Sequence, residues 1–84
     1  MQETRDSSVC RLLFEIVSAL ADHADAIRIT AVDQPEGTCF SIVTHPEDVG
    51  KIVGKQGRTA RSLRTIVSGI GMKSRRRYAV SIEE

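Results

Sequence analysis

The stretch that most constrains the fold is Gly54-Lys55-Gln56-Gly57, where one apolar helical pattern stops and another begins at Arg58. We refer to residues 54–57 as the tip. Glycine readily adopts the left-handed conformation that often ends a helix, so the tip predicts a tight connection between two helices. The first turn of a helix leaves backbone N–H groups unpaired at the positive end of its dipole. With Lys55 beside them, these groups predict an anion site that the main chain itself helps to form.

The chain before the tip reads as a helix followed by a β-hairpin. Ser7 or Ser8 can cap a helix whose apolar positions recur every three or four residues, at Val9, Leu12, Leu13, Ile16, Val17 and Leu20. Residues 26–32 alternate between apolar and polar, and residues 38–44 are rich in β-branched side chains. The turn-forming residues 33–37 between them include Pro35 and Gly37, so this pair of strands predicts a hairpin.

Two helices and a strand are predicted around and after the tip. Pro46 suits a first helical position, and Val49, Ile52 and Val53 give this short helix a buried side. Gly50 lies inside this helix, where glycine lowers helix stability by about 1 kcal/mol relative to alanine. This glycine either allows close approach of a backbone or base or is simply tolerated. The helix after the tip has apolar positions Ala60, Leu63, Ile66, Val67 and Ile70. Gly69-Ile70-Gly71 is expected to weaken its end, before a loop and a strand from Tyr78 to Ile82.

Length and composition indicate one small domain, with residues 1–7 as a flexible N-terminus and residues 8–84 as the folded unit. No apolar run approaches the roughly 20 residues of a membrane helix, and the polar N-terminus does not resemble a secretory signal. Cys10 and Cys39 lack Cys-x-x-Cys spacing, so we expect reduced thiols. These features favour a cytoplasmic protein without a membrane partner.

The formal net charge of +1 hides a strong asymmetry along the chain. Residues 1–50 carry three basic and nine acidic side chains, whereas residues 51–82 carry nine basic side chains and no acidic one. Solvated surfaces usually mix the two signs. The segregation therefore indicates a polyanionic partner, the alternative being an ordinary solvated helix face.

Other phosphate-binding motifs do not fit the tip. A P-loop needs four residues between its first glycine and the Gly-Lys pair, whereas three separate Gly50 from Gly54, and Gln56 stands where Ser or Thr is required. A dinucleotide fingerprint fails because no G-x-G-x-x-G occurs in the chain. What remains is G-x-x-G between two short helices, in the element order α-β-β-α-α-β.

Ile52-Val53-Gly54-Lys55-Gln56-Gly57 resembles the signature of the K-homology (KH) domain, and the element order resembles its type II form. Residues 46–60, the following Leu63-Arg64-Thr65 and the ending Val80-Ser81-Ile82-Glu83-Glu84 are similar to the KhpA family of small single-KH bacterial RNA-binding proteins. The resemblance covers nearly the whole chain. It implies an α+β fold in which three helices pack on one face of a three-stranded sheet.

The resemblance also implies a site for single-stranded RNA, because a KH domain clamps about four unpaired nucleotides with its G-x-x-G loop against the backbone. The loop before the last strand is expected to flank this groove. Stacking on aromatic rings should be minor, since Phe14 and Phe40 look buried. The residues expected to contact RNA are Gly50, Lys51, Val53, Gly54, Lys55, Gln56, Gly57, Arg58, Arg61, Arg64, Lys73, Arg75 and Arg76.

No enzyme, cofactor, metal site or small-molecule substrate is expected. His23, His45 and the two cysteines are scattered along the chain, and no catalytic set of side chains converges. The resemblance implies an RNA chaperone or post-transcriptional regulator linked to cell elongation or division. It also implies self-association or pairing with a larger KH protein of the KhpB type. A protein-interaction adapter that does not bind RNA, or a partner of the ribosome, remain alternatives.

Overall fold

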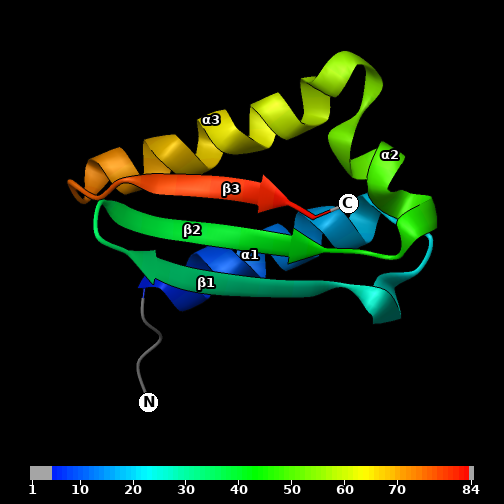
Figure 1. Cartoon of the computed structure of the whole chain (residues 1–84), viewed down its shortest axis with the longest axis horizontal. Helices are drawn as coiled ribbons and strands as arrows, with labels where there is room; N and C mark the ends of the chain where they lie inside the picture. Colours follow the sequence, from blue (N-terminus) through cyan, green and yellow to red (C-terminus); the bar gives the residue numbers. More distant parts are fainter. Residues whose placement is uncertain (1–4, 84) are drawn as a thin grey trace.

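The computed structural model describes residues 5–83, and the predicted order α-β-β-α-α-β is confirmed (Figure 1). Short 3-10 turns η1 (Ala24–Ala26), η2 (Pro46–Asp48) and η3 (Lys55–Gly57) connect the main elements. The main elements are α1 (Arg5–Leu20), β1 (Arg28–Gln34), β2 (Gly37–Val43), α2 (Val49–Val53), α3 (Arg58–Lys73) and β3 (Tyr78–Ile82).

The sheet is mixed and has the order β1-β2-β3. β1 and β2 form the predicted antiparallel hairpin, in which Ala31 lies opposite Phe40. β3 pairs with β2 in parallel, so that Phe40 also lies beside Val80. Parallel neighbours need a long crossover between them, and here α2, the tip and α3 together form that crossover. The tip therefore lies outside the sheet, at one end of the molecule (Figure 1).

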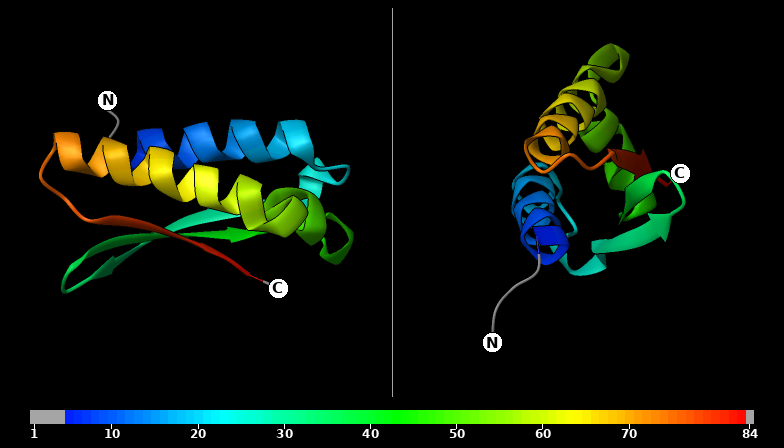
Figure 2. Two further views of the ribbon diagram at one scale, coloured as in Figure 1. Left: turned by 90° about the horizontal axis from the view of Figure 1, so that it is seen from above. Right: turned by 90° about the vertical axis from the view of Figure 1, so that its left-hand side faces the viewer.

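The helices cover one face of the sheet, as predicted. α1 and α3 lie over the same face, and α2 stands at the end of this layer (Figure 2). The hydrophobic core lies between the helices and the sheet, because each element buries the apolar side chains of one face. The core residues are Val9, Leu13, Val17, Ile27, Phe40, Ile42, Ile52, Leu63, Val67, Tyr78 and Val80.

α1 begins earlier than predicted. Residues 5–7 form its first turn instead of a flexible N-terminus, and residues 1–4 lie outside the described part of the chain. The Tyr78 hydroxyl donates to Asp6 Oδ1 at 2.7 Å, which ties this turn to the start of β3. Burial raises the pKa of Tyr78, and the hydrogen bond to Asp6 raises it further.

The buried stripe of α1 is also narrower than its sequence indicates. Val9, Leu13 and Val17 are buried, whereas Leu12 and Leu20 are more than one third exposed. Phe14 is 43% exposed, so the expectation that its ring is buried is wrong. Cys10 and Ile16 are partly buried and pack beside this stripe, so the contact of α1 with the core is centred on Val9, Leu13 and Val17.

The end of α3 also differs from expectation, because the helix continues through Gly69-Ile70-Gly71 to Lys73. Gly71 is buried against the start of β3. A Cβ atom placed there would lie 2.6 Å from the Arg76 carbonyl oxygen and 2.9 Å from Tyr78 Cγ. This glycine therefore allows the helix and the strand to approach each other closely, and it does not end the helix.

Cys10 and Cys39 are free cysteines, as expected. Within residues 5–83, no helix has the length and the apolar character needed to cross a bilayer.

Candidate nucleic-acid interface

The tip is built from three backbone conformations with positive φ. Gly54 has φ 80° and ψ 170°, Gln56 has φ 58° and ψ 24°, and Gly57 has φ 72° and ψ 15°. The Gly57 amide donates to the Gly54 carbonyl at 3.0 Å, and the Arg58 amide donates to the Lys55 carbonyl. Among residues 5–83, nothing accepts a hydrogen bond from the amides of Lys55 and Gln56. These two amides are the main-chain donors that the tip offers to a ligand.

Glycine is required at position 54 for two reasons. Its φ of 80° lies in the region that side-chain-bearing residues rarely adopt. A Cβ atom at Gly54 would also lie 2.7 Å from Thr59 Cβ and 2.9 Å from Thr59 N, so the first turn of α3 packs directly on it. By contrast, no described atom lies within 4 Å of a Cβ placed at Gly50 or Gly57. The surface next to these two glycines is open to a ligand.

Three exposed cations surround the tip, from Lys55, Arg58 and Arg61. Arg58 Nη2 donates to Gln56 Oε1 at 3.1 Å, and Arg61 Nη2 lies 3.4 Å from the Gln56 carbonyl oxygen. Both arginines thus converge on the residue at the centre of the tip. No carboxylate in the described part of the chain forms an ion pair with any of the three. We call Lys55, Arg58 and Arg61 the tip cations.

Lys51, a predicted RNA-contacting residue, is exposed on α2, and its ammonium lies against two carboxylates. Its Nζ lies 3.0 Å from Asp22 Oδ2 and 3.4 Å from Asp48 Oδ1, in the loop between α1 and β1 and at the start of α2. These carboxylates raise the pKa of Lys51. Lys51 therefore fixes the position of α2, and its charge is already paired.

Asp48 connects α2 to the loop after α1, a role that its place at the start of a predicted helix does not reveal. Its side chain is fully buried and accepts hydrogen bonds from the Asp22 amide at 3.1 Å and the His23 amide at 2.9 Å. Burial by itself would raise the pKa of Asp48, but these amides and the Lys51 ammonium together lower it. The partners lie about 25 positions away in the chain, so only the fold reveals them.

Two further predicted residues extend the site from the tip along the helices. Val53 is partly buried at the end of α2, directly before Gly54. Arg64 lies two turns into α3, and its Nε is 3.4 Å from the Val80 carbonyl oxygen on the edge strand β3. The surface from Gly50 to Arg64 therefore joins α2, the tip, α3 and β3.

The basic residues of the loop before β3 do not join this cluster. Lys73 ends α3, about 22 Å from Arg58 along the helix axis, and Arg75 and Arg76 follow it in the loop at that end (Figure 1). We call Arg75–Arg77 the arginine loop. The structure thus separates the predicted RNA-contacting residues into two groups, one at each end of α3.

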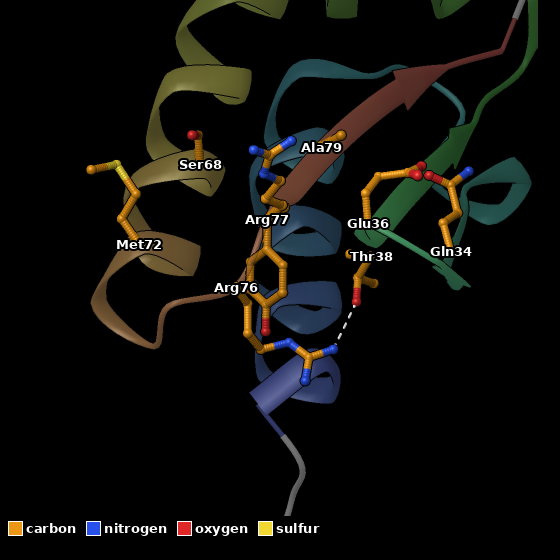
Figure 3. Close-up of a pocket in the computed structure, with 10 residues that line it drawn as sticks. Gln34, Glu36, Thr38, Ser68, Met72, Arg76, Arg77 and Ala79 are labelled. Carbon is orange, nitrogen blue, oxygen red and sulfur yellow. Dashed lines mark hydrogen bonds between the residues drawn. The ribbon is translucent and has the colours of Figure 1, made fainter.

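The arginine loop packs on the β1–β2 hairpin. Arg76 Nη2 donates to Thr38 Oγ1 at 3.1 Å, and its guanidinium lies 5.9 Å from the centre of the Tyr78 ring. Figure 3 shows Arg76 and Arg77 pointing to opposite ends of a pocket between α3, β3 and the hairpin turn. Asp33 and Glu36 from that turn line a neighbouring pocket together with all three arginines. The fold therefore brings the carboxylates of Asp33 and Glu36 close to the arginine loop.

The sequence was compared with known proteins. The family model described as KhpA/KhpB, KH domain, matches residues 11–82. The RNA-binding protein KhpA of Halalkalibacterium halodurans is 39% identical over 71 residues, covering 84% of this chain and 93% of that protein. The RNA-binding protein KhpA of Bacillus subtilis is 37% identical over 71 residues, covering 84% and 88%.

The RNA-binding protein KhpA of Streptomyces coelicolor is 34% identical over 71 residues, covering 84% of this chain and 90% of that protein. No solved structure matches the chain. The family match spans the hairpin, the tip, both helices around it and the last strand, which are the elements that build the site described above. The chain belongs to the KhpA/KhpB KH-domain family.

Proposed function

We propose that this protein binds single-stranded RNA through the tip and the adjoining surfaces of α2 and α3, and that it does so without catalysis. The observation that carries this proposal is the exposed tip itself. It combines two unpaired amides, open space beside Gly50 and Gly57, and three cations without carboxylate partners among residues 5–83. Such a surface suits the phosphates of a nucleic-acid strand.

Three relatives named RNA-binding protein KhpA support RNA as the nucleic acid. In this proposal the amides of Lys55 and Gln56 and the tip cations hold phosphates, while Gly50 and Val53 border the bases. Arg64 extends the contact toward β3. A G-x-x-G loop of this kind clamps about four nucleotides, so affinity at one site is modest and falls steeply with salt.

The remaining predicted residues act differently in this proposal. Lys51 positions α2, because its ammonium is paired with Asp22 and Asp48. Lys73, Arg75 and Arg76 contact RNA only when the RNA is long enough to extend along the whole of α3.

We further propose that the protein works in the cytoplasm as an RNA chaperone or post-transcriptional regulator linked to cell elongation or division. It would pair with a second copy of itself or with a larger KH protein of the KhpB type, whose name the matched family includes. Two linked weak sites bind a long RNA far more tightly than one, because the second contact is intramolecular. Sedimentation of the protein alone and with such a partner tests this pairing.

The decisive experiment replaces the two exposed tip side chains by acids. Lys55→Asp with Gln56→Asp should reduce the affinity for a short unstructured RNA by at least about tenfold, because phosphates are then repelled. Fluorescence anisotropy measures the affinity, and circular dichroism checks that the fold is retained. The matched control is Arg28→Asp with Gln34→Asp, the same kind of change on exposed positions of β1.

Unchanged RNA binding by the tip variant would remove the tip as the contact surface. The adapter function would then be the better explanation, and it predicts that complexes with protein partners persist in this variant. Co-sedimentation with ribosomal subunits that high salt abolishes would instead favour the ribosomal alternative.

A further inference from the structure

His23, His45 and Glu47 form a cluster that their sequence positions do not suggest. The fold brings the loop after α1 against the start of the 3-10 turn η2, and the two imidazole rings stack with centroids 4.0 Å apart and planes inclined by 21°. His23 Nε2 lies 3.0 Å from Glu47 Oε1. One potential ligand atom from each residue lies within 4.8 Å of the other two. The fold therefore brings together two histidines that lie far apart in the sequence.

The chemistry of this cluster suits a metal ion. Two imidazoles and one carboxylate are the donors that Zn²⁺, Ni²⁺ and Cu²⁺ prefer, and three protein ligands leave a position for water. Both histidines are partly exposed and Glu47 is exposed, so an ion can enter from solvent. We propose that His23, His45 and Glu47 bind a divalent transition-metal ion of the zinc class.

The backbone around the cluster is already fixed, which reduces the ordering that binding requires. The buried Asp48 carboxylate holds the His23 amide at 2.9 Å and the Asp22 amide at 3.1 Å. The Glu47 amide donates to His45 Nδ1 at 3.0 Å. Two segments more than 20 positions apart in the chain are thus held in one arrangement before any ion arrives. Rigid support of this kind favours metal affinity.

The local charge also favours a cation. Asp22 and Asp25 are exposed beside His23, and Glu47 and Asp48 lie on the facing segment. Two cations lie near these residues: Lys51 pairs with Asp22 and Asp48, and the Arg28 guanidinium donates to the Asp25 carbonyl oxygen at 3.1 Å. His45 Nδ1 accepts the Glu47 amide hydrogen and is therefore occupied, so His45 offers its Nε2 atom to an ion, which displaces the Nε2 proton on binding.

Binding requires a small rearrangement of the side chains. The donor atoms of a tetrahedral zinc site lie about 3.3 Å apart, closer than the upper limit of 4.8 Å found here. Lone pairs lie in the plane of an imidazole ring, so the two stacked rings must tilt to point at a common ion. The His23 side chain is 39% exposed and has room to turn. The ion then joins the α1–β1 loop to the segment that leads into α2.

The experiment uses untagged protein, because a polyhistidine tag would bind the same ions. Titration calorimetry with ZnCl₂ should show one equivalent bound, and the unfolding midpoint should rise with ZnCl₂ and return with EDTA. CoCl₂ should give the visible absorption of a nitrogen- and oxygen-ligated ion. Absence of binding by the wild-type protein would overturn the proposal and leave the cluster as a clamp between two loops.

Two conservative variants test the ligands without unfolding the protein. His45→Asn removes the imidazole but keeps a side-chain oxygen that can accept from the Glu47 amide. Glu47→Gln removes the carboxylate charge at the same size. Each should weaken zinc binding by at least about tenfold while leaving the unfolding midpoint in EDTA near that of the wild type. The control Cys10→Ser with Cys39→Ser should bind zinc normally.

Equal zinc affinity of His45→Asn and the wild type would show that the ion sits elsewhere, and loss in the cysteine control would place it on the thiols. Either result overturns the proposal. RNA affinity is measured separately without zinc, so the test does not depend on the function proposed above.

Discussion

The two ends of α3 carry similar numbers of basic side chains, but they use them differently. At the tip, Lys55, Arg58 and Arg61 are exposed, and the two arginines donate hydrogen bonds to Gln56. At the far end, Arg76 bonds Thr38 and packs on Tyr78, and Asp33 and Glu36 line the same pocket as the arginine loop. The cations at the tip have no carboxylate partner among residues 5–83, whereas at the far end Arg76 joins the start of β3 to the hairpin and acidic side chains lie nearby.

Basic side chains that are far from acidic ones in the sequence can lie beside them in the folded protein. Residues 51–82 contain no acidic side chain, yet the hairpin turn from the acidic half lies directly beside the arginine loop. Acids from that half also reach Lys51, whose two partners are Asp22 and Asp48. At the tip, by contrast, Lys55, Arg58 and Arg61 form no ion pair with a carboxylate among residues 5–83. The surface available to a polyanion is thus smaller than the sequence indicates.

The largest effect is expected from the support beneath the tip. Asp48→Asn removes the charge that holds Lys51 and weakens the acceptor for the Asp22 and His23 amides, so it should lower the unfolding midpoint more than any other change discussed below. The matched change at the far end is Asp6→Asn. It keeps an acceptor for Tyr78 and should have a small effect. If Asp48→Asn and Asp6→Asn lowered the unfolding midpoint equally, the expectation that Asp48 contributes more would be wrong.

The same carboxylate makes stability depend on pH. The folded pKa of Asp48 lies below its ordinary value of 3.8. Its contribution is therefore complete above that pH and is lost as the pH falls through the folded pKa. Thermal unfolding between pH 2 and pH 6 (about the range in which carboxylates titrate) should show a steeper decline for the wild type than for Asp48→Asn. Parallel curves would show that Asp48 does not contribute.

The second effect compares the two glycines that allow close packing at either end. Gly54→Ala places a Cβ against Thr59 at a positive φ, and should cost about 1–3 kcal/mol and reduce RNA affinity. Gly71→Ala forces the end of α3 away from Tyr78 and should destabilise the fold by a similar amount. RNA affinity per folded molecule should remain unchanged in the second variant, measured well below its unfolding midpoint. An equal loss of affinity in both would mean that the tip is not a local contact.

The third effect tests the two groups of cations directly. Arg58→Ala with Arg61→Ala should weaken binding of a short single-stranded RNA by about tenfold. It should also flatten the slope of log K against log salt by about 1.4, because each phosphate contact adds about 0.7. Arg75→Ala with Arg77→Ala should change affinity by less than about threefold. Similar losses from both pairs would show that even a short RNA reaches the far end.

The smallest effect comes from removing the acids beside the arginine loop. Asp33→Asn with Glu36→Gln leaves three arginines without neighbouring carboxylates from the hairpin turn. Affinity for a long single-stranded RNA should then rise by about two- to threefold at low salt, and this gain should vanish as salt screens the loop. No gain would mean that distance from the tip, and not neutralisation, keeps the arginine loop out of the contact.

Sequence periodicity was sufficient to predict the main elements of the fold. The apolar spacing of residues 9–20 and 60–70 and the alternation in the hairpin identified helices and strands whose order the structure confirms. The exact ends were harder to predict. The start of α1 depends on the Asp6–Tyr78 contact, and the end of α3 depends on Gly71 packing against β3, so both are set by distant parts of the chain.

The part of the candidate site that lies in one continuous stretch was predictable from the sequence. The contacts between segments that are distant in the sequence were not. The tip lies in one stretch, and two glycines around two polar residues predicted its connection between helices. The pairing of Lys51 with Asp22 and Asp48, and the stacking of His23 on His45, join segments that no short pattern links. The distance between the tip and the arginine loop likewise follows from the length of an unbroken α3.

The crossover between two parallel strands has a consequence for engineering. The register of β2 against β3 is set by core residues such as Phe40 and Val80, and none of these belongs to the tip. Positions 55 and 56 of the tip can therefore be exchanged, provided that Gly54 and Gly57 stay and that position 56 receives a residue that tolerates its φ of 58°. Libraries built on this small scaffold can vary the side chains of the tip without changing the register of the sheet.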